Sequence, residues 1–344
     1  YTNYPAYSKI AVFHFYDIHK ITSIYILSHL SEKYNSRVKI YLYFRTYGLY
    51  NMHVQIKHNL CKCFVHNSNN RTLAILYLEE KFMGKISLQM YTMREHTKTL
   101  EDLNSTVGRL ADIGFKTLQY SIPDKYDAKE VKKIFNAHGI TNDSVFCPSL
   151  KLEEKMNKII SECDLFDTKY VRTDSITSGL TTEAAGYKCF AHYLNEACDE
   201  FKKHGIKLLY HFHAFEFKRF GDETGIDILL KETDPEYIQI IPDTHWIHSG
   251  GKNVVEFLEK YQDRYDYIHT KDFAIGARAE KLEARPIEFA PVGEGNLDWK
   301  AIIDFCKKKG VLSYAIEQDN CYGRDEFDCV TSSYNFLKKM GVED

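Results

Sequence analysis

The stretch IKLLYHFHAFE, residues 206–216, joins an apolar run to two imidazoles and a carboxylate. Its apolar part is typical of a buried parallel strand. Because side chains alternate along a strand, His211 and His213 share one face. Tyr210 and Phe212 share the other face, and we expect them to pack beneath helices. Both imidazoles should then point into the mouth of a site.

Three later stretches repeat this pattern of an apolar run followed by polar side chains. If the four stretches are parallel strands of one barrel, their carboxyl ends meet at one mouth. Such a mouth would hold carboxylates and imidazoles, a set suited to a divalent metal and to proton transfer. The three later polar runs are Asp243-Thr244-His245, His269-Thr270-Lys271-Asp272 and Glu317-Gln318-Asp319, after apolar residues 237–241, 265–268 and 311–316.

Residues 83–344 alternate short apolar runs with longer amphipathic ones, such as 100–114 and 182–204, which we expect to be helices. Eight strands alternating with helices over this length match a (β/α)8 TIM barrel. A doubly wound open sheet is the alternative, but it would need a glycine-rich phosphate turn after an early strand, and none is present. The Gly293-Glu294-Gly295 run precedes Asp298 and predicts a loop and a helix cap. The eight predicted strands are 85–90, 115–120, 143–147, 169–173, 207–212, 237–242, 265–270 and 312–317.

Residues 1–82 differ in composition from the rest of the chain. They carry ten Lys/Arg against four Asp/Glu, whereas the remainder carries 35 against 44. They also hold eleven of the 25 tyrosines and one of the 18 glycines, without sustained periodicity. A small folded domain, a targeting segment and sequence foreign to the mature protein are the three interpretations, and a transit peptide would be richer in Arg and Ser. We expect residues 1–82 to be a poorly structured extension, disordered or not part of the mature protein.

The overall composition is that of a water-soluble globular protein. The chain is 44% hydrophobic and 27% charged, with a formal net charge of -3. This charge gives no sign of nucleic-acid or membrane binding, and no run approaches the roughly 18 apolar residues of a membrane-spanning helix. The nine cysteines are scattered and resemble no disulfide framework, which favours reduced thiols and a cytoplasmic location.

Taken singly, each polar residue at the strand ends has an ordinary structural interpretation. Asp243 could cap the following helix, and Lys271 could be a solvated lysine instead of a group that neutralises a substrate oxyanion. Glu317 follows so apolar a run that its charge would be costly unless paired or bound to metal. Together, Asp243, His269, Glu317 and one fifth-strand histidine, taken as His211, predict a metal site. Such ligands suit Mn best, then Zn, Co or Mg, and disfavour calcium.

The motifs of residues 83–344 resemble those of the sugar phosphate isomerase/epimerase family, which has a xylose isomerase-like barrel and includes ketose 3-epimerases and inosose dehydratases. Residues 1–82 share none of this resemblance. The chain departs from the family's epimerases at the fifth strand, where they carry a glutamate and this chain has His211 and His213. Gln119 also stands where many relatives have glutamate. The segments that carry the resemblance are 88–94, 210–217, 243–246, 269–272, 292–296 and 317–323.

The resemblance implies a divalent metal at the barrel mouth that binds adjacent oxygens of a keto-sugar or polyol. It implies an isomerase or epimerase that moves a proton next to a carbonyl; an inosose-type dehydratase and a non-catalytic sugar-binding barrel are the alternatives. The net charge argues against the DNA-binding role of related endonucleases. A small carbohydrate is the expected partner, and a homo-oligomer is left open. The expected catalytic residues are Glu317, His213, Glu216 and Lys271; those expected to bind substrate are Tyr91, Arg94, Arg172, His245 and Trp246.

Overall fold

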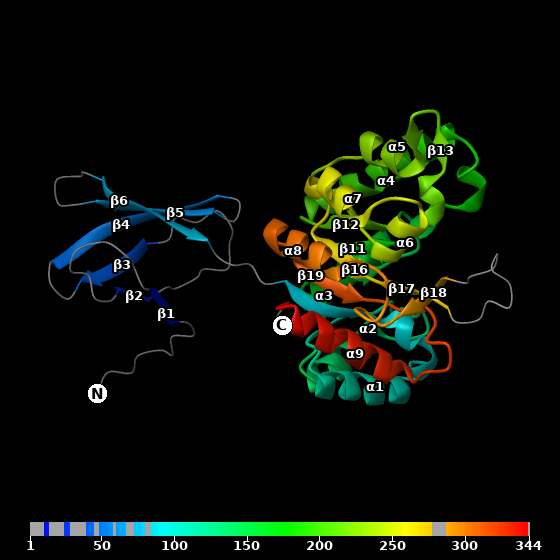
Figure 1. The fold of residues 1–344 in the computed structure, drawn as a ribbon, viewed down its shortest axis with the longest axis horizontal. Coiled ribbons are helices and arrows are strands. Elements are labelled where there is room, and N and C mark those ends of the chain that lie inside the picture. Colours follow the sequence, from blue (N-terminus) through cyan, green and yellow to red (C-terminus); the bar gives the residue numbers. More distant parts are fainter. Residues whose placement is uncertain are drawn as a thin grey trace. The chain divides into compact units, whose positions relative to one another are not determined.

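The computed structural model describes residues 10–13, 24–27, 39–44, 48–57, 60–66, 72–79, 84–276 and 287–342. The chain divides into two compact units, Tyr1–Phe82 and Met83–Asp344, which are described separately (Figure 1). The division falls at the predicted boundary.

The described part of the first unit consists of six strands in one antiparallel sheet, in which each strand pairs with the next along the chain. Whether residues 1–82 are a poorly structured extension or lie outside the mature protein stays a prediction. N-terminal sequencing of the native protein tests it, and a mature terminus well before residue 80 would contradict it. The strands are β1 Ile10–Phe13, β2 Ile24–Leu27, β3 Lys39–Phe44, β4 Gly48–Lys57, β5 Leu60–His66 and β6 Thr72–Glu79.

The second unit contains a strand in each of the eight predicted stretches. The third barrel strand has two parts, β9 before the predicted stretch 143–147 and β10 within it. Asp143 lies at the break, and its carboxylate accepts hydrogen bonds from Ser313 Oγ at 2.8 Å and Ser144 Oγ at 3.0 Å. The strands are β7 Lys85–Gln89, β8 Thr117–Gln119, β9 Thr141–Asn142 with β10 Val145–Phe146, β11 Tyr170–Thr173, β12 Lys207–His211, β15 Ile238–Ile241, β16 Tyr267–Thr270 and β19 Ser313–Ile316.

These strands close into a parallel barrel. One parallel sheet has the order β16-β19-β7-β8-β9 and the other the order β10-β11-β12-β15. A parallel bridge between Asp243 and His269 joins β15 to β16, while β9 and β10 follow each other along the chain. Closure confirms the (β/α)8 prediction and excludes the open doubly wound sheet.

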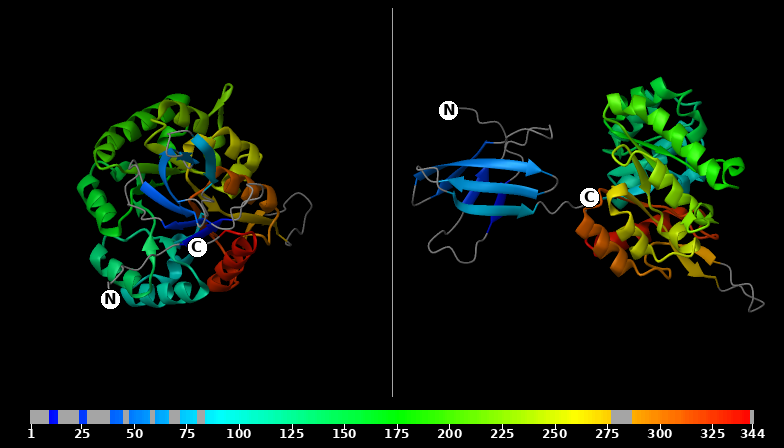
Figure 2. Two further views of the ribbon diagram at one scale, coloured as in Figure 1. Left: turned by 90° about the vertical axis from the view of Figure 1, so that its left-hand side faces the viewer. Right: turned by 90° about the horizontal axis from the view of Figure 1, so that it is seen from above.

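Helices surround the parallel strands, as the left panel of Figure 2 shows. No helix in the described part of the chain combines the length and the apolar character that crossing a bilayer requires. Two short antiparallel pairs, β13 Arg219–Phe220 with β14 Glu223–Thr224 and β17 Asp272–Ile275 with β18 Ile287–Ala290, follow β12 and β16. The helices are α1 Leu100–Ile113, α2 Ala128–Ala137, α3 Met156–Phe166, α4 Ala184–Lys203, α5 Gly225–Glu232, α6 Thr244–Ser249, α7 Val254–Lys260, α8 Trp299–Lys309 and α9 Glu326–Lys339.

Local sequence signals fix several helix ends. Helix α1 begins with a reciprocal capping box between Thr99 and Asp102, and it ends at Gly114, whose φ of 127° suits glycine. Asp298 caps α8 through a hydrogen bond from Ala301 N, which confirms the predicted cap.

The alternation predicted for the fifth strand is confirmed. Tyr210 and Phe212 are fully buried; Tyr210 packs edge-on against Phe190 of α4, and Phe212 packs against Phe257 of α7. The opposite face of the same strand end carries His211, whose ring lies toward the barrel mouth. The apolar face therefore anchors the strand that presents the imidazole.

Asp272, at the end of the seventh barrel strand, holds the predicted glycine loop in place. Its fully buried carboxylate accepts hydrogen bonds from Gly293 N and Gly295 N, both at 3.0 Å, and from Trp299 Nε1 at 2.5 Å. Phe273 N and Leu297 N also donate to it. A Cβ at position 295 would lie 2.4 Å from the same carboxylate, so glycine is required there. One carboxylate thus joins the barrel to the start of α8.

We expect Asp272→Asn to lower the free energy of unfolding by about 3 kcal/mol, because an amide cannot accept at both ends and leaves buried N–H groups without a partner. Urea unfolding measures this loss. The exposed Asp222→Asn serves as a control with a change within about 0.5 kcal/mol. Equal effects of the two substitutions would contradict the account.

Candidate metal centre

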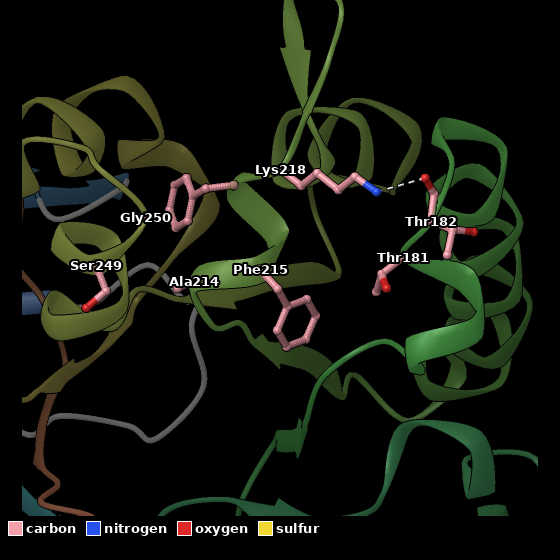
Figure 3. Close-up of a pocket in the computed structure, with 8 residues that line it drawn as sticks. Thr181, Thr182, Ala214, Phe215, Lys218, Ser249 and Gly250 are labelled. Carbon is pink, nitrogen blue, oxygen red and sulfur yellow. Dashed lines mark hydrogen bonds between the residues drawn. The ribbon is translucent and has the colours of Figure 1, made fainter.

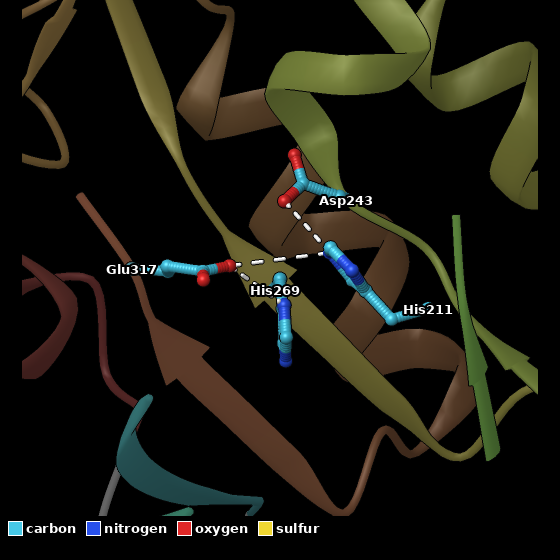
Figure 4. Close-up of side chains that lie close together, drawn as sticks. All are labelled: His211, Asp243, His269 and Glu317. Atoms are coloured by element: carbon cyan, nitrogen blue, oxygen red, sulfur yellow. Dashed lines mark hydrogen bonds and ion pairs between the residues drawn. The ribbon is translucent and has the colours of Figure 1, made fainter. Parts of the chain in front are cut away.

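Four buried side chains from successive strand ends meet at the barrel mouth (Figure 4). His211 ends β12, Asp243 follows β15, His269 lies on β16 and Glu317 follows β19. One potential ligand atom from each lies within 4.8 Å of all the others. The structure thus brings together all four residues that the sequence predicts as metal ligands.

The distances within this cluster suit a shared cation. His211 Nε2 lies 3.3 Å from Asp243 Oδ2 and 4.0 Å from Glu317 Oε2, and His269 Nδ1 lies 2.9 Å from the same Glu317 oxygen. His269 Nδ1 and Glu317 Oε2 are nevertheless buried without hydrogen-bond geometry to any partner. A metal ion between two buried electron-pair donors would satisfy both of them where no hydrogen bond does. The donor set therefore fits a divalent metal.

Gln119 orients His269 from behind. Its Oε1 lies 2.9 Å from His269 Nε2, and because a carboxamide oxygen only accepts, Nε2 carries the ring proton. The lone pair is then on Nδ1, which faces Glu317. This is the outer-shell hydrogen bond that metal-binding histidines typically make. The sequence analysis counted Gln119 only as a lost ligand and missed this role.

Asp243 has two roles, one for each oxygen. Its Oδ1 caps α6 by accepting a hydrogen bond from Trp246 N at 3.0 Å, and its Oδ2 faces His211. The capping interpretation left open from the sequence is therefore confirmed, and the metal-ligand interpretation stays a prediction. Capping fixes the carboxylate so that its second oxygen stays in the cluster.

Lys271 lies beside the cluster and is 1% exposed. Its Nζ is 3.1 Å from Glu317 Oε2, 3.4 Å from Asp243 Oδ2 and 3.0 Å from Asp319 Oδ1. Burial alone would lower the pKa of Lys271, but the three carboxylates hold it well above its ordinary value. Lys271 is therefore an ammonium ion inside the site.

Asp319 is a further site residue to which the sequence analysis gave no role. It lies two residues after Glu317, so strand alternation could have indicated that both point to the same side. Burial and the neighbouring Glu317 charge raise the pKa of Asp319 to about 6, against the opposing effect of Lys271. Asp319 thus completes a group of three carboxylates around one ammonium.

Burial keeps the imidazoles of His211, His213 and His245 neutral. It lowers the pKa of His211 to about 3, although Asp243 acts in the opposite direction, and it lowers the pKa of His245 to about 4. Burial also lowers the pKa of His213. Neutral imidazole is the form that binds a metal, so His211 needs no deprotonation at neutral pH.

Aromatic rings form one side of the site. Lys271 Nζ lies 5.2 Å from the ring centre of Trp246 and 5.6 Å from that of Phe289, within cation–π range. The rings of His213 and His245 pack against Trp246 at 5.3 and 4.7 Å. The structure therefore places the predicted residues His245 and Trp246 at the site. Phe289, on β18, was missed because its strand lies outside the barrel order.

The other predicted substrate-binding residues divide into two groups. Arg172 is buried near the cluster; its Nη2 donates to Ser121 Oγ at 3.2 Å, and its Nε has no partner. Arg94 instead donates to the backbone oxygens of Tyr91 and Asp319, both at 2.9 Å, and lies over the exposed Tyr91 ring. Arg94 therefore braces the loop that carries Asp319 at the rim of the mouth.

Glu216 is not brought into the cluster. Its fully buried carboxylate accepts hydrogen bonds from Tyr210 Oη at 2.6 Å and from His213 N at 2.9 Å. These bonds hold the backbone of His213 at the end of β12. Burial raises the pKa of Glu216 to about 7.

The raised pKa of Glu216 predicts a pH-dependent stability. Between about pH 4.5 and pH 7 the folded state keeps a proton that the unfolded state loses, so the free energy of unfolding decreases as pH rises. Relative to Glu216→Gln, which cannot titrate, the wild type should lose about 2 to 3 kcal/mol between pH 5 and pH 8. Urea unfolding at both pH values measures this, with exposed Glu236→Gln as control. A constant difference between wild type and Glu216→Gln would contradict it.

A cavity of about 380 Å³ lies beside the mouth (Figure 3). Phe215, which stacks on His213 at a ring separation of 5.7 Å, forms part of its wall. Lys218 Nζ donates to Thr182 O at 3.0 Å across it. Its lining comes from segments that follow β11, β12 and β15, namely Thr181, Thr182, Ala214, Phe215, Phe217, Lys218, Ser249 and Gly250.

Comparison with known proteins agrees with this fold. A family model described as a xylose isomerase-like TIM barrel matches residues 107–330. The structure of a sugar phosphate isomerase/epimerase from Parabacteroides distasonis superimposes with a TM-score of 0.60 at 22% identity, over 74% of this chain and 94% of that one. The chain therefore belongs to the xylose isomerase-like TIM barrel family.

Curated relatives include two inosose dehydratases. The protein from Geobacillus kaustophilus is 34% identical over 119 residues, which are 32% of this chain. The protein from Clostridium perfringens is 26% identical over 208 residues, which are 56% of this chain. These matches span 37% and 65% of the two relatives' own lengths.

Proposed function

We propose that this protein is a metal-dependent sugar isomerase or epimerase that moves a proton next to the carbonyl of a keto-sugar or polyol. The observation that carries the proposal is the buried cluster of His211, Asp243, His269 and Glu317, with two electron-pair donors left without hydrogen bonds. Buried electron-pair donors that face each other without a hydrogen bond are costly, and a divalent cation between them would remove this cost.

The four residues of the cluster would hold one divalent ion, with Mn as the first choice and Zn, Co or Mg as alternatives. When bound, such an ion polarises a carbonyl and an adjacent hydroxyl, which lowers the cost of forming an enediolate. His211 and His269 supply neutral nitrogens, and Asp243 and Glu317 supply charge. Gln119 keeps the proton of His269 away from the site.

Glu317 is the proposed base. Its carboxylate would take the proton from the carbon next to the carbonyl, and the electron pair of that C–H bond would become the enediolate double bond. Lys271 lies 3.1 Å from Glu317 Oε2 and would stabilise the developing oxyanion through its ammonium. Because Lys271 is buried, water does not weaken this interaction.

His213 is the proposed carrier of the second proton. Its Nδ1 has no hydrogen-bond partner, and its ring lies 4.8 Å from that of His211. Glu216 was expected to share this task; its bonds to Tyr210 and to the His213 backbone support a positioning role instead. Its carboxylate would fix the backbone position of His213 and, through it, the position of the imidazole ring.

The walls of the mouth would bind the rest of the substrate. The free Nε of Arg172 can donate to a hydroxyl or phosphate oxygen, and the Trp246 ring offers an apolar face to sugar C–H groups. The cavity beside Phe215 has room for the part of the substrate that would extend past the metal site. The small-carbohydrate partner, the cytoplasmic location and a homo-oligomer stay predictions.

Dehydration of an inosose-type substrate is the second candidate. Imidazole replaces the fifth-strand glutamate of the family's epimerases, and inosose dehydratases are among the curated relatives. In that reaction Glu317 would take the same proton, and the neutral ring of His213 would relay a proton from Glu317 to the departing hydroxyl, accepting it on one nitrogen and donating from the other. Both candidates share the first step. They differ in the fate of the enediolate, which is protonated in an isomerase or epimerase and loses a hydroxyl group in a dehydratase.

Proton NMR in deuterium oxide separates these functions. The Mn²⁺-loaded full chain is incubated with keto-sugars and inososes, and the signal of the α-proton is followed. Deuterium incorporation without loss of water supports an isomerase or epimerase, and formation of an unsaturated product supports the dehydratase. If no substrate shows deuterium exchange or dehydration, and a sugar still binds tightly after the metal is removed by a chelator, the non-catalytic barrel is supported.

A further inference from the structure

The ammonium of Lys271 contacts the same oxygens that face the imidazoles of the proposed metal centre. Asp243 Oδ2 lies 3.4 Å from Lys271 Nζ and 3.3 Å from His211 Nε2. Glu317 Oε2 lies 3.1 Å from Lys271 Nζ and 2.9 Å from His269 Nδ1. The lysine therefore uses the oxygens that a metal ion would need.

A third carboxylate offers this ammonium another partner. Asp319 lies outside the four-residue cluster, and its two oxygens are 3.0 and 3.1 Å from Lys271 Nζ. Arg94 fixes the backbone of Asp319 by donating to its carbonyl oxygen at 2.9 Å. A buried ammonium must keep a partner, since Lys271 is too enclosed to exchange a lost carboxylate for water.

We propose that Lys271 is the internal cation of the metal-free centre, and that Asp319 is the positioning residue that receives its ammonium when a divalent ion takes Asp243 and Glu317. This inference rests on the proposed metal-dependent function. It adds that Lys271 and the metal ion compete for two carboxylate oxygens, and that Asp319 decides how strongly they compete.

The two residues should then have opposite effects on metal affinity. Without Lys271 the ion meets no competing charge, so Lys271→Met should tighten Mn²⁺ binding about tenfold or more. Without the Asp319 charge the ammonium stays on Asp243 and Glu317, so Asp319→Asn should weaken Mn²⁺ binding about tenfold. Asp319→Glu should restore most of the affinity, because it keeps the carboxylate.

A double-mutant cycle tests whether Asp319 acts through Lys271. The dissociation constant of Mn²⁺ is measured for the chelator-stripped full chain by isothermal titration calorimetry. Lys309→Met, which removes a largely buried lysine beside Asp266 at the end of α8, serves as the control and should leave the constant unchanged. In a Lys271→Met background the added Asp319→Asn substitution should cost much less than it does alone.

Thermal unfolding gives a second readout for variants that fold poorly. Metal-free Lys271→Met leaves the buried carboxylates of Asp243 and Glu317, and the partly exposed carboxylate of Asp319, without an ammonium, so its melting temperature should fall below that of the wild type. Added Mn²⁺ should raise the melting temperature of this variant more than that of the wild type.

Weaker or unchanged Mn²⁺ binding by Lys271→Met would overturn the competition. An equal cost of Asp319→Asn in both backgrounds would show that Asp319 attracts the ion directly and would overturn its positioning role. Either result leaves the proposed function in place, provided that the wild type binds Mn²⁺. A wild type that binds no divalent ion would overturn both.

Discussion

A Glu317→Gln variant is expected to lose at least about a thousandfold of kcat/KM and to retain no bound metal. Glu317 supplies a ligand oxygen and the proposed base, and an amide neither accepts the proton nor carries the charge that the ion needs. Glu317 is 5% exposed, so bulk water has little access to take over its role. Steady-state kinetics on the substrate found by deuterium exchange, with metal in excess, measures the loss.

The matched control for this variant is Glu236→Gln, the same change at an exposed position. It should retain full activity and metal content. If the kcat/KM of Glu317→Gln is within about tenfold of the wild-type value, Glu317 is not the base of the reaction.

Replacing Lys271 by Met is expected to lower kcat about a hundredfold to a thousandfold at saturating metal. The buried ammonium is the charge nearest to Glu317 that can stabilise a developing oxyanion, and loss of one such group typically has this effect. Metal binding should not fall with it. Measuring kcat and metal content on the same preparation separates the two effects.

This combination distinguishes a catalytic ammonium from a structural one. If Lys271 only held the carboxylates together, excess metal would replace it and kcat would recover. Recovery of wild-type kcat at saturating metal would therefore contradict the assigned role. Lys309→Met again provides the control, because its lysine pairs with Asp266 away from the mouth.

The sequence predicts the barrel and its metal ligands because both depend on short-range patterns. An apolar run that ends in a charged residue identifies a buried strand end, and parallel strands must bring such ends to one mouth. These patterns alone predict that His211, Asp243, His269 and Glu317 lie together. The family resemblance adds His245 and Trp246 as expected substrate-binding residues.

The residues that the sequence analysis missed depend on contacts that local patterns do not contain. Gln119 binds His269 across 150 positions of sequence, and Phe289 reaches the site from a hairpin outside the barrel order. Asp319 was visible in the motif but had no predicted partner. Its role follows only from the position of Lys271.

For Glu216, the sequence pattern predicted a proton-transfer role that the contacts of its carboxylate do not support. A carboxylate three residues after His213 looked suited to proton transfer, but the short helical turn at residues 214–217 directs it inward, where Tyr210 binds it. Sequence spacing gave its distance from the strand end and not its direction. Likewise, a sequence pattern that assigns one role to each residue could not predict that the two oxygens of Asp243 have different partners.

The proposed function requires that four strand-end residues hold one divalent metal for proton transfer. Elemental mass spectrometry of the purified full chain, measured beside Glu317→Gln, tests this requirement. The wild type should contain about one equivalent of Mn, Zn, Co or Mg, and the variant should contain none. A wild type that holds no metal even after reconstitution with Mn²⁺ would contradict it.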